Sequence, residues 1–129
     1  MPLHHVALDA LDYEATRRFY TEGLGLTARI EWGTPGSRAT MLAIPGGGHV
    51  EVFERTDRGL PTEPAALLHF AIKVESTEAA YRRALAHGAT ARSAPQRVRI
   101  DGTSTAEVHI AFCTGLDGEI IEFFESADL

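Results

Sequence analysis

The sequence predicts an α+β fold built from two copies of a β-α-β-β-β module. Three observations predict it: an internal repeat, short alternating strands in each copy, and one capped helix after the first strand of each copy. The 129 residues suit a single domain. One copy alone is marginal in size, so the copies are expected to pack together or to pair with another chain.

The repeat links the beginnings and the ends of the two copies. Residues 5–18 align with residues 69–82, with the identities His5/His69, Ala7/Ala71, Glu14/Glu78, Ala15/Ala79 and Arg18/Arg82. Residues 50–54 (VEVFE) align with residues 121–125 (IEFFE). We therefore expect one domain over residues 1–129. Its modules lie at about 1–56 and 66–126, and a Gly- and Pro-containing linker lies at about 57–65.

The first copy begins with a β-forming segment at residues 3–9. Asp12 is a good N-cap for a helix over residues 13–21, which ends at Gly23 or Gly25. Strands are predicted next at residues 27–32, 39–44 and 49–54, with Gly46-Gly47-Gly48 as the turn before the last of them.

The second copy repeats this order. A strand is predicted at residues 67–74, and Ser76 caps a helix over residues 77–86 that ends at Gly88. Further strands are predicted at residues 91–94, 107–113 and 119–124, with Asp117-Gly118 as the last turn.

Composition excludes several classes of function. The net charge of -6 disfavours nucleic acid and anionic membranes as partners. No apolar run approaches the ~18 residues of a membrane span, and the first residues do not resemble a signal peptide, so we expect a cytoplasmic protein. Cys113 is the only cysteine, which excludes an intrachain disulfide and favours a buried strand residue over a nucleophile.

Strand alternation separates an apolar face from a polar one. Val6, Leu8, Val50, Val52, Phe70, Ile72, Ile121 and Phe123 fall on faces suited to packing against a helix. His5, Glu51, His69 and Glu122 all fall on the opposite faces. If that side curves around a cavity, two imidazoles and two carboxylates meet inside it.

Such a cluster is typical of a divalent metal site. Polar groups in an apolar cavity are costly unless a partner satisfies them, and two carboxylates repel one another. Neutral imidazoles and ionised carboxylates are suitable ligands for a divalent cation, with one or two positions left open for substrate or water. The alternative for each residue alone is a hydrogen-bonded or solvated strand side chain.

These segments resemble the vicinal oxygen chelate superfamily, also called the glyoxalase/bleomycin-resistance/dioxygenase family. The resemblance covers about residues 3–126. It rests on residues 5–8 (HVAL), 23–26 (GLGL), 50–53 (VEVF), 68–71 (LHFA), 87–89 (HGA), Asp117-Gly118 and 121–123 (IEF), together with Asp12 before a helix that contains Phe19-Tyr20. It implies paired βαβββ modules in a curved mixed sheet around a metal or ligand cavity, with the helices on the outer face.

The resemblance also implies a chemistry. The glyoxalase I metal positions fall on His5, Glu51, His69 and Glu122, which implies a divalent ion such as Ni, Co, Zn, Mn or Fe. In that enzyme class a carboxylate ligand abstracts a proton next to a carbonyl. Glu122 occupies the position expected for this base, and Glu51 is the second carboxylate. Asp9 stands where glyoxalase I carries an arginine for the glutathione carboxylate, so a glutathione adduct is disfavoured as substrate.

Other residues are candidates for substrate binding. His49 shares the face of Glu51, and Phe53, Phe124 and Trp32 can contact a flat ligand. Arg38, Arg97 and Arg99 can hold an anionic one, although each also suits an ordinary solvated strand. His4 is expected on the opposite face from His5, and alternation does not fix the face of His109.

The function predicted first is a metal-dependent lyase or isomerase of glyoxalase I type, acting on a small oxygen-chelating substrate. The alternative is a metal-independent protein that sequesters a drug or natural product, as bleomycin-resistance members do. A third class is a dioxygenase or epimerase of the same superfamily. A homodimer is expected, with each site either within one chain or shared between two.

Overall fold

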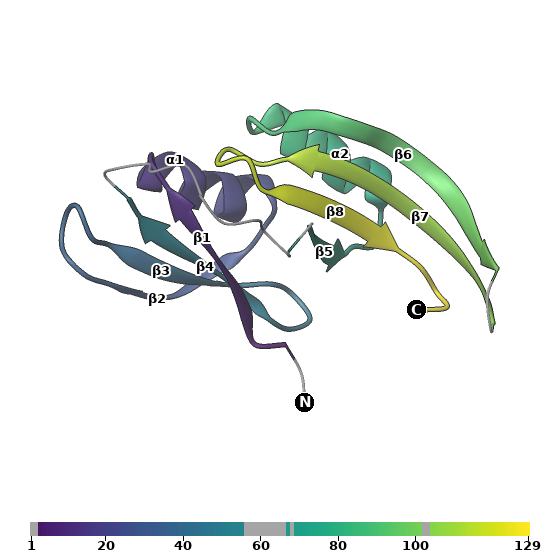
Figure 1. Cartoon of the computed structure of the whole chain (residues 1–129), viewed down its shortest axis with the longest axis horizontal. Coiled ribbons are helices and arrows are strands. Elements are labelled where there is room, and N and C mark those ends of the chain that lie inside the picture. Colours follow the sequence, from purple (N-terminus) through teal and green to yellow (C-terminus); the bar gives the residue numbers. More distant parts are fainter. Residues whose placement is uncertain (1–2, 56–66, 68, 102–103) are drawn as a thin grey trace. The chain divides into compact units, whose positions relative to one another are not determined.

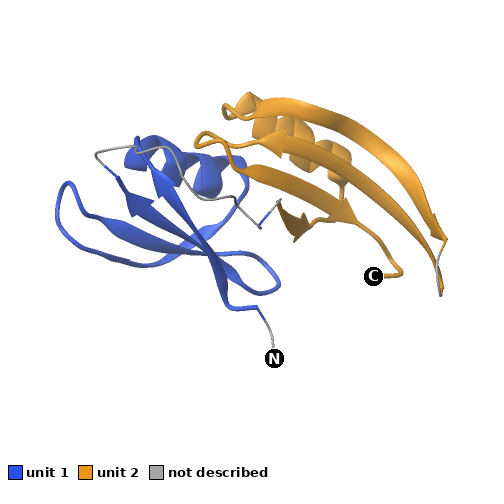
Figure 2. Cartoon of the chain, viewed as in Figure 1, with its two compact units in different colours: residues 1–68 blue, residues 69–129 orange. Residues whose placement is uncertain are grey.

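Two units of the same construction make up the chain, at residues 1–68 and 69–129 (Figure 2). The computed structural model describes residues 3–55, 67, 69–101 and 104–129. The predicted linker at about 57–65 lies wholly in a segment outside the described residues, as do positions 66 and 68.

The first unit has the predicted β-α-β-β-β order (Figure 1). Its elements are β1 (His5–Ala10), α1 (Tyr13–Arg18), a π-helical turn η1 (Phe19–Gly23), β2 (Thr27–Trp32), β3 (Ala39–Ala43) and β4 (His49–Glu54). The strand order is β1-β4-β3-β2, with β1 parallel to β4 and the other neighbours antiparallel. The first strand of the module therefore pairs with its last.

The second unit repeats this topology. Its elements are β5 (Phe70–Lys73), α2 (Thr77–Ala86), β6 (Thr90–Asp101), β7 (Thr105–Thr114) and β8 (Ile120–Glu125). The strand order is β5-β8-β7-β6, again with the first strand parallel to the last. Together the two units confirm the predicted α+β fold of two βαβββ modules.

Both helices begin at the predicted caps. The Asp12 carboxylate accepts a hydrogen bond from the Ala15 main-chain N–H at 2.9 Å, and the Ser76 hydroxyl accepts one from Ala79 at 3.2 Å. Gly88 follows the end of α2 at a φ of +106°, a conformation that favours glycine. In the first unit the helical segment continues beyond Arg18 as η1 and ends at Gly23.

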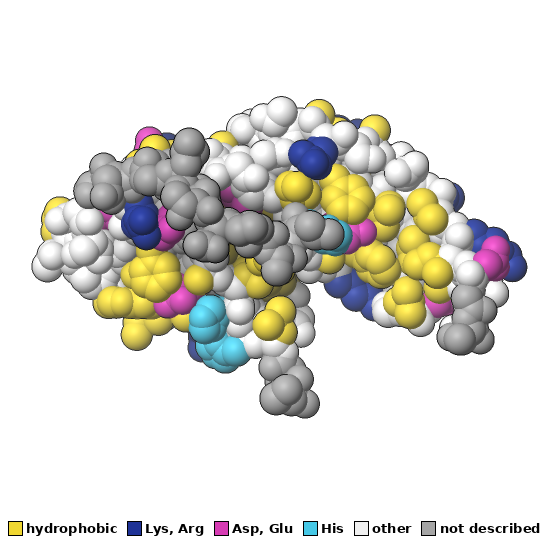
Figure 3. Space-filling model, viewed as in Figure 1, with side chains coloured by type: hydrophobic (Ala, Val, Ile, Leu, Met, Phe, Trp, Pro, Cys, Tyr) yellow, Lys and Arg dark blue, Asp and Glu magenta, His cyan; other side chains and the backbone are white. Residues whose placement is uncertain are grey.

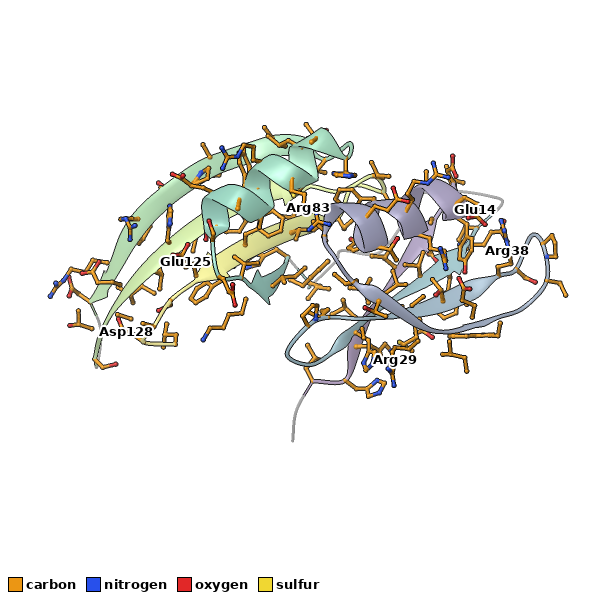
Figure 4. All side chains as sticks on the ribbon, turned by 180° about the vertical axis from the view of Figure 1, so that it is seen from behind. Glu14, Arg29, Arg38, Arg83, Glu125 and Asp128 are labelled. Carbon is orange, nitrogen blue, oxygen red and sulfur yellow. The ribbon has the colours of Figure 1, made fainter. Side chains whose placement is uncertain are left out.

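Each unit has a core between its sheet and its helix. In the first unit, α1 packs against β4, and Val50, Val52 and Leu42 are fully buried with Phe19 and Tyr20. In the second unit, α2 lies across β6, β7 and β8 (Figure 4), and the buried set includes Ile72, Ala84, Ala111, Cys113, Ile121 and Phe123. The strand faces predicted as apolar are thus the helix-covered faces.

Two strands differ in length from their predictions. β5 is shorter than the predicted 67–74, so His69 immediately precedes the strand. β6 is much longer than the predicted 91–94, and Pro95 lies where its register with β7 shifts, between Ser93 and Gln96. Because β6 is an edge strand, the missing N–H of Pro95 interrupts little of the sheet. No helix in the described part of the chain is long and apolar enough to cross a membrane.

Candidate functional site

The first His–Glu pair, His5 and Glu51, lies on the face of its sheet that α1 does not cover. Parallel pairing of β1 with β4 places Ala7 opposite Glu51, and His5 is the preceding residue on the same face. The His5 Nε2 lies 3.3 Å from the Glu51 Oε2. The Glu51 side chain is 13% exposed and the His5 side chain is 40% exposed, so the imidazole is the more accessible of the two groups.

The second His–Glu pair, His69 and Glu122, repeats this geometry. Ala71 lies opposite Glu122 across the parallel β5–β8 pairing, as Ala7 lies opposite Glu51. The His69 Nε2 lies 3.0 Å from the Glu122 Oε2, and the side chains are 39% and 11% exposed. The repeat seen in the sequence is therefore also a repeat of side-chain contacts.

Each pair offers donors that fit a divalent cation. An imidazole nitrogen and a carboxylate oxygen already contact one another, and both are ligand types for such ions. Within the described residues, no group of three or more His, Cys, Asp or Glu side chains is arranged to hold a metal ion. The structure thus forms two pairs of donors, one in each unit.

The surroundings of the two pairs differ. In the second unit the His69 and Phe112 rings pack edge to face, with their centroids 5.4 Å apart. Phe112 lies opposite Glu122 on β7, and Ile110 lies opposite Phe124 on the same face. Figure 3 shows hydrophobic side chains covering much of the second unit's visible face. This pair lies in an apolar setting.

In the first unit two more imidazoles lie beside the pair. The His4 and His49 rings stack at a centroid distance of 4.8 Å and an interplanar angle of 28°. The His4 Nδ1 lies 2.9 Å from the His5 Nδ1. The expected placement of His4 away from His5 is wrong, because His4 precedes β1 and strand alternation does not extend to it.

The predicted aromatic residues share the faces of the two pairs. Phe53 is two residues after Glu51 on β4, and Phe124 is two residues after Glu122 on β8. Trp32 lies on the edge strand β2 and pairs with Ala39, and Ala39 in turn pairs with Phe53. Trp32 is therefore on the same face as Phe53. It is 42% exposed. His49 is on this face as well.

Arg38 lies on the other side of the first sheet. It donates two hydrogen bonds to the Glu54 carboxylate, ion-pairs with Glu14 at 2.7 Å and covers the Tyr13 ring, with its guanidinium carbon 4.6 Å from the ring centroid (Figure 4). These bonds lower the pKa of Glu54 to about 2, the Arg38 side chain being the largest cause. Arg38 is thus held by contacts of the fold, on the face away from His5 and Glu51.

Arg97 and Arg99 are also away from the second His–Glu pair. Arg97 lies opposite His109, which lies opposite Glu125, on the face covered by α2. Arg99 is exposed and ion-pairs with Asp101 and Glu107. The face of His109, which alternation left open, is therefore the helix face.

His109 and Glu125 form a further ion pair, with the His109 Nδ1 3.2 Å from the Glu125 Oε2. The Glu125 carboxylate also accepts a hydrogen bond from the Thr77 main-chain N–H at the start of α2. This N–H, and then the charge of His109, lower the pKa of Glu125. The contact fixes the end of β8 to the helix.

Each unit contains a small cavity. One, of about 250 Å³, is lined by Tyr13, Glu14, Glu31, Trp32, Gly33 and Arg38. The other, also of about 250 Å³, is lined by Arg97, Glu107, Val108, His109, Glu125 and residues 126–128. Neither contains a residue of the two His–Glu pairs.

Comparison with known proteins agrees with the fold. The family model described as Glyoxalase/Bleomycin resistance protein/Dioxygenase superfamily matches residues 2–123. The crystal structure of a glyoxalase family protein from Enterococcus faecalis is 28% identical, with a TM-score of 0.70, and the match covers 96% of this chain and 97% of that one.

Two more distant structures show the fold alone. Glyoxalase I from Zea mays is 20% identical with a TM-score of 0.72, over 96% of this chain and 46% of that one. TioX from Micromonospora sp. ML1 is 17% identical with a TM-score of 0.66, over 98% of this chain and 99% of that one. None of the curated proteins compared with the chain matches it.

Proposed function

Because the chain belongs to the glyoxalase/bleomycin resistance protein/dioxygenase superfamily, we propose that it is a metal-dependent lyase or isomerase of glyoxalase I type. Its substrate is a small molecule with two adjacent oxygens. The observation that carries the proposal is the repeated His–Glu contact, 3.3 Å in the first pair and 3.0 Å in the second, at equivalent places of both modules.

In this proposal His5, Glu51, His69 and Glu122 share one divalent cation such as Ni, Co, Zn, Mn or Fe. The pairs come either from one chain or from two chains of a homodimer. Such a cation, when bound, would polarise the substrate's oxygens and so acidify the adjacent C–H bond. The proton transfer itself is assigned to the protein side chains.

Glu122 is the proposed base. Its carboxylate is 11% exposed and contacts the His69 Nε2, and Phe112 lies opposite it in the sheet. A base in such a position is shielded from water. It can therefore keep the proton that it takes from carbon and return that proton to the adjacent carbon or oxygen. Glu51, with a similar exposure and contact, is the second carboxylate and the alternative base.

Asp9 limits the choice of substrate. It is on the face of the first pair, opposite Phe53, and ion-pairs with Arg55 at 3.2 Å. Asp9 offers no positive charge that could hold an anionic group of the substrate, and its carboxylate engages the Arg55 guanidinium. Neutral α-ketoaldehyde–thiol adducts therefore suit the site better than a glutathione adduct.

The test compares metal binding with turnover. Wild-type protein freed of metal is titrated calorimetrically with Ni²⁺, Co²⁺ and Zn²⁺, then assayed on a panel of α-ketoaldehyde–thiol adducts. We expect the wild-type protein to bind one cation per set of four donors. We expect the Glu122→Gln variant to bind metal but to turn over substrate at least about 100-fold more slowly than wild type. Glu107→Gln, an exposed carboxylate on β7, is the matched control. Absence of stoichiometric metal binding contradicts the proposal.

A second candidate function is sequestration of an aromatic natural product without a metal. Trp32, 42% exposed on the face that also carries Phe53, favours it as a stacking surface. Tight binding of an aromatic compound that is unaffected by chelator and by His5→Ala supports this function over the first.

A further inference from the structure

Three imidazoles, those of His4, His5 and His49, form a connected chain at the start of the first sheet. Figure 3 shows the histidine side chains of the first unit gathered in one patch. The His49 Nδ1 lies 3.1 Å from the His4 carbonyl oxygen, the His49 ring stacks on the His4 ring, and the His4 Nδ1 lies 2.9 Å from the His5 Nδ1. The glyoxalase I-type ligand set accounts only for His5.

The partners of these rings assign their protons. A carbonyl oxygen only accepts, so the His49 Nδ1 carries a hydrogen and donates it to His4. The Nδ1 atoms of His4 and His5 share one hydrogen, since one must donate and the other accept. The His5 Nε2 lies beside a carboxylate, and without a cation it carries a hydrogen toward Glu51. In the neutral His5 ring, Nδ1 is then the acceptor and the His4 Nδ1 is the donor.

We propose that His4 is a positioning residue that fixes the ring orientation and tautomer of His5. The inference rests on the proposed function, in which His5 binds the cation through Nε2. His5 must then carry its hydrogen on Nδ1, and the atom placed to accept it is the His4 Nδ1, 2.9 Å away.

Protons balance in this change. With a cation bound, the His5 Nε2 would hold no hydrogen, and that hydrogen would have gone to solvent. The hydrogen shared between the two Nδ1 atoms passes from His4 to His5. His4 then takes a hydrogen from solvent on its own Nε2, so its tautomer is reversed with no net change in its charge. His49 keeps its Nδ1 hydrogen throughout, because its acceptor is a main-chain carbonyl.

The second unit lacks the residues for such a chain. The sequence places Leu68 and Ile120 at the positions equivalent to His4 and His49, and neither side chain has a ring nitrogen. The described neighbour of the His69 ring is the Phe112 ring, which offers no acceptor nitrogen. The positioning role is therefore specific to the first His–Glu pair.

The experiment measures Zn²⁺ affinity and histidine tautomers in the same full-length protein. Calorimetric titration compares wild type with His4→Ala, His4→Asn and the control His87→Ala, which removes an exposed imidazole at the end of α2. We expect His4→Ala to weaken Zn²⁺ binding by about 10- to 100-fold. His4→Asn, whose amide oxygen can accept the His5 hydrogen, is expected to recover part of this loss, and His87→Ala to cause none.

Nitrogen-15 NMR of the imidazole rings supplies a second readout. On addition of Zn²⁺ to wild type, His4 is expected to change from the Nδ1–H to the Nε2–H form while His49 remains Nδ1–H. Wild type that binds no Zn²⁺ contradicts the proposed function. If wild type binds Zn²⁺ but the Zn²⁺ affinity of His4→Ala is within twofold of the wild-type value, the positioning role alone is overturned. The same holds if His4 in wild type stays in the Nδ1–H form after Zn²⁺ is added. Thermal unfolding of each variant checks that the fold is kept.

Discussion

Arg38 holds Glu54 through two parallel hydrogen bonds, from Nε to Oε2 at 2.9 Å and from Nη2 to Oε1 at 2.8 Å. The Arg38 main-chain N–H donates to the same carboxylate. From the sequence, Arg38 is a candidate to hold an anionic substrate. In the structure it instead pairs with an anionic side chain of the first unit, Glu54.

Acid destabilisation is the first prediction. The pKa of Glu54 is lowered from 4.5 to about 2, so its ionised form stabilises the fold at a pH above about 4.5. That contribution is lost as the pH falls from about 4.5 toward about 2. Urea unfolding at pH 7 and pH 3 is expected to show a smaller loss of stability for Glu54→Gln than for wild type. Glu75→Gln, at an exposed position, is the control and is expected to behave as wild type; equal pH dependence in all three proteins contradicts the prediction.

Removal of the first helix cap is the second prediction. Asp12→Ala deletes the acceptor of the Ala15 N–H and is expected to lower the free energy of unfolding by about 0.5–2 kcal/mol. Asp12→Ser, which keeps an acceptor, is expected to recover most of the loss. Chemical denaturation at pH 7 measures both, and an Asp12→Ala variant as stable as wild type contradicts the role of the cap.

The reactivity of the single thiol is the third prediction. Cys113 is fully buried on β7, and burial raises its pKa to about 11. At pH 8 only about one thiol in a thousand is then ionised, and the thiolate is the reactive form. A disulfide reagent is expected to label folded protein at least about 100-fold more slowly than protein in denaturant. Comparable rates in the two conditions show that β7 is accessible in the folded chain.

Loss of a carboxylate ligand is the fourth prediction. Glu51→Ala removes one of the four proposed donors and is expected to weaken metal affinity at least about tenfold, since even an outer partner of a ligand is worth that much. Glu107→Ala, exposed and bonded to Arg99, is the matched control. Calorimetric titration measures both. Unchanged affinity in Glu51→Ala excludes it as a ligand.

The modules and the two His–Glu pairs could be predicted from the sequence because they depend on local patterns. Period-two alternation assigns His5 and Glu51 to one face, and the repeat transfers that assignment to His69 and Glu122. The caps Asp12 and Ser76 mark where the helices begin.

Other features depend on partners that no local pattern specifies. The length of β6 is set by its pairing with β7, which tolerates Pro95 at an edge. The contact of His4 with His5 and His49 depends on a residue outside the strand, and Arg38 is engaged by Glu14 and Glu54, which are distant in sequence. Whether four donors share one cation depends on how two modules meet, and the pattern within each module does not encode it.

The parallel pairing of β1 with β4, and of β5 with β8, has a consequence for biosynthesis. In each module the histidine lies at the start of the first strand, in β1 for His5 and just before β5 for His69, and the module closes only when the strand that carries its glutamate has left the ribosome. Such long-range pairings are slow steps of folding, because closing the long intervening loop costs entropy before the pairing contacts form. Each His–Glu contact is therefore among the last to form in its module, and the nascent β1 has no strand partner on either edge until β4 is made.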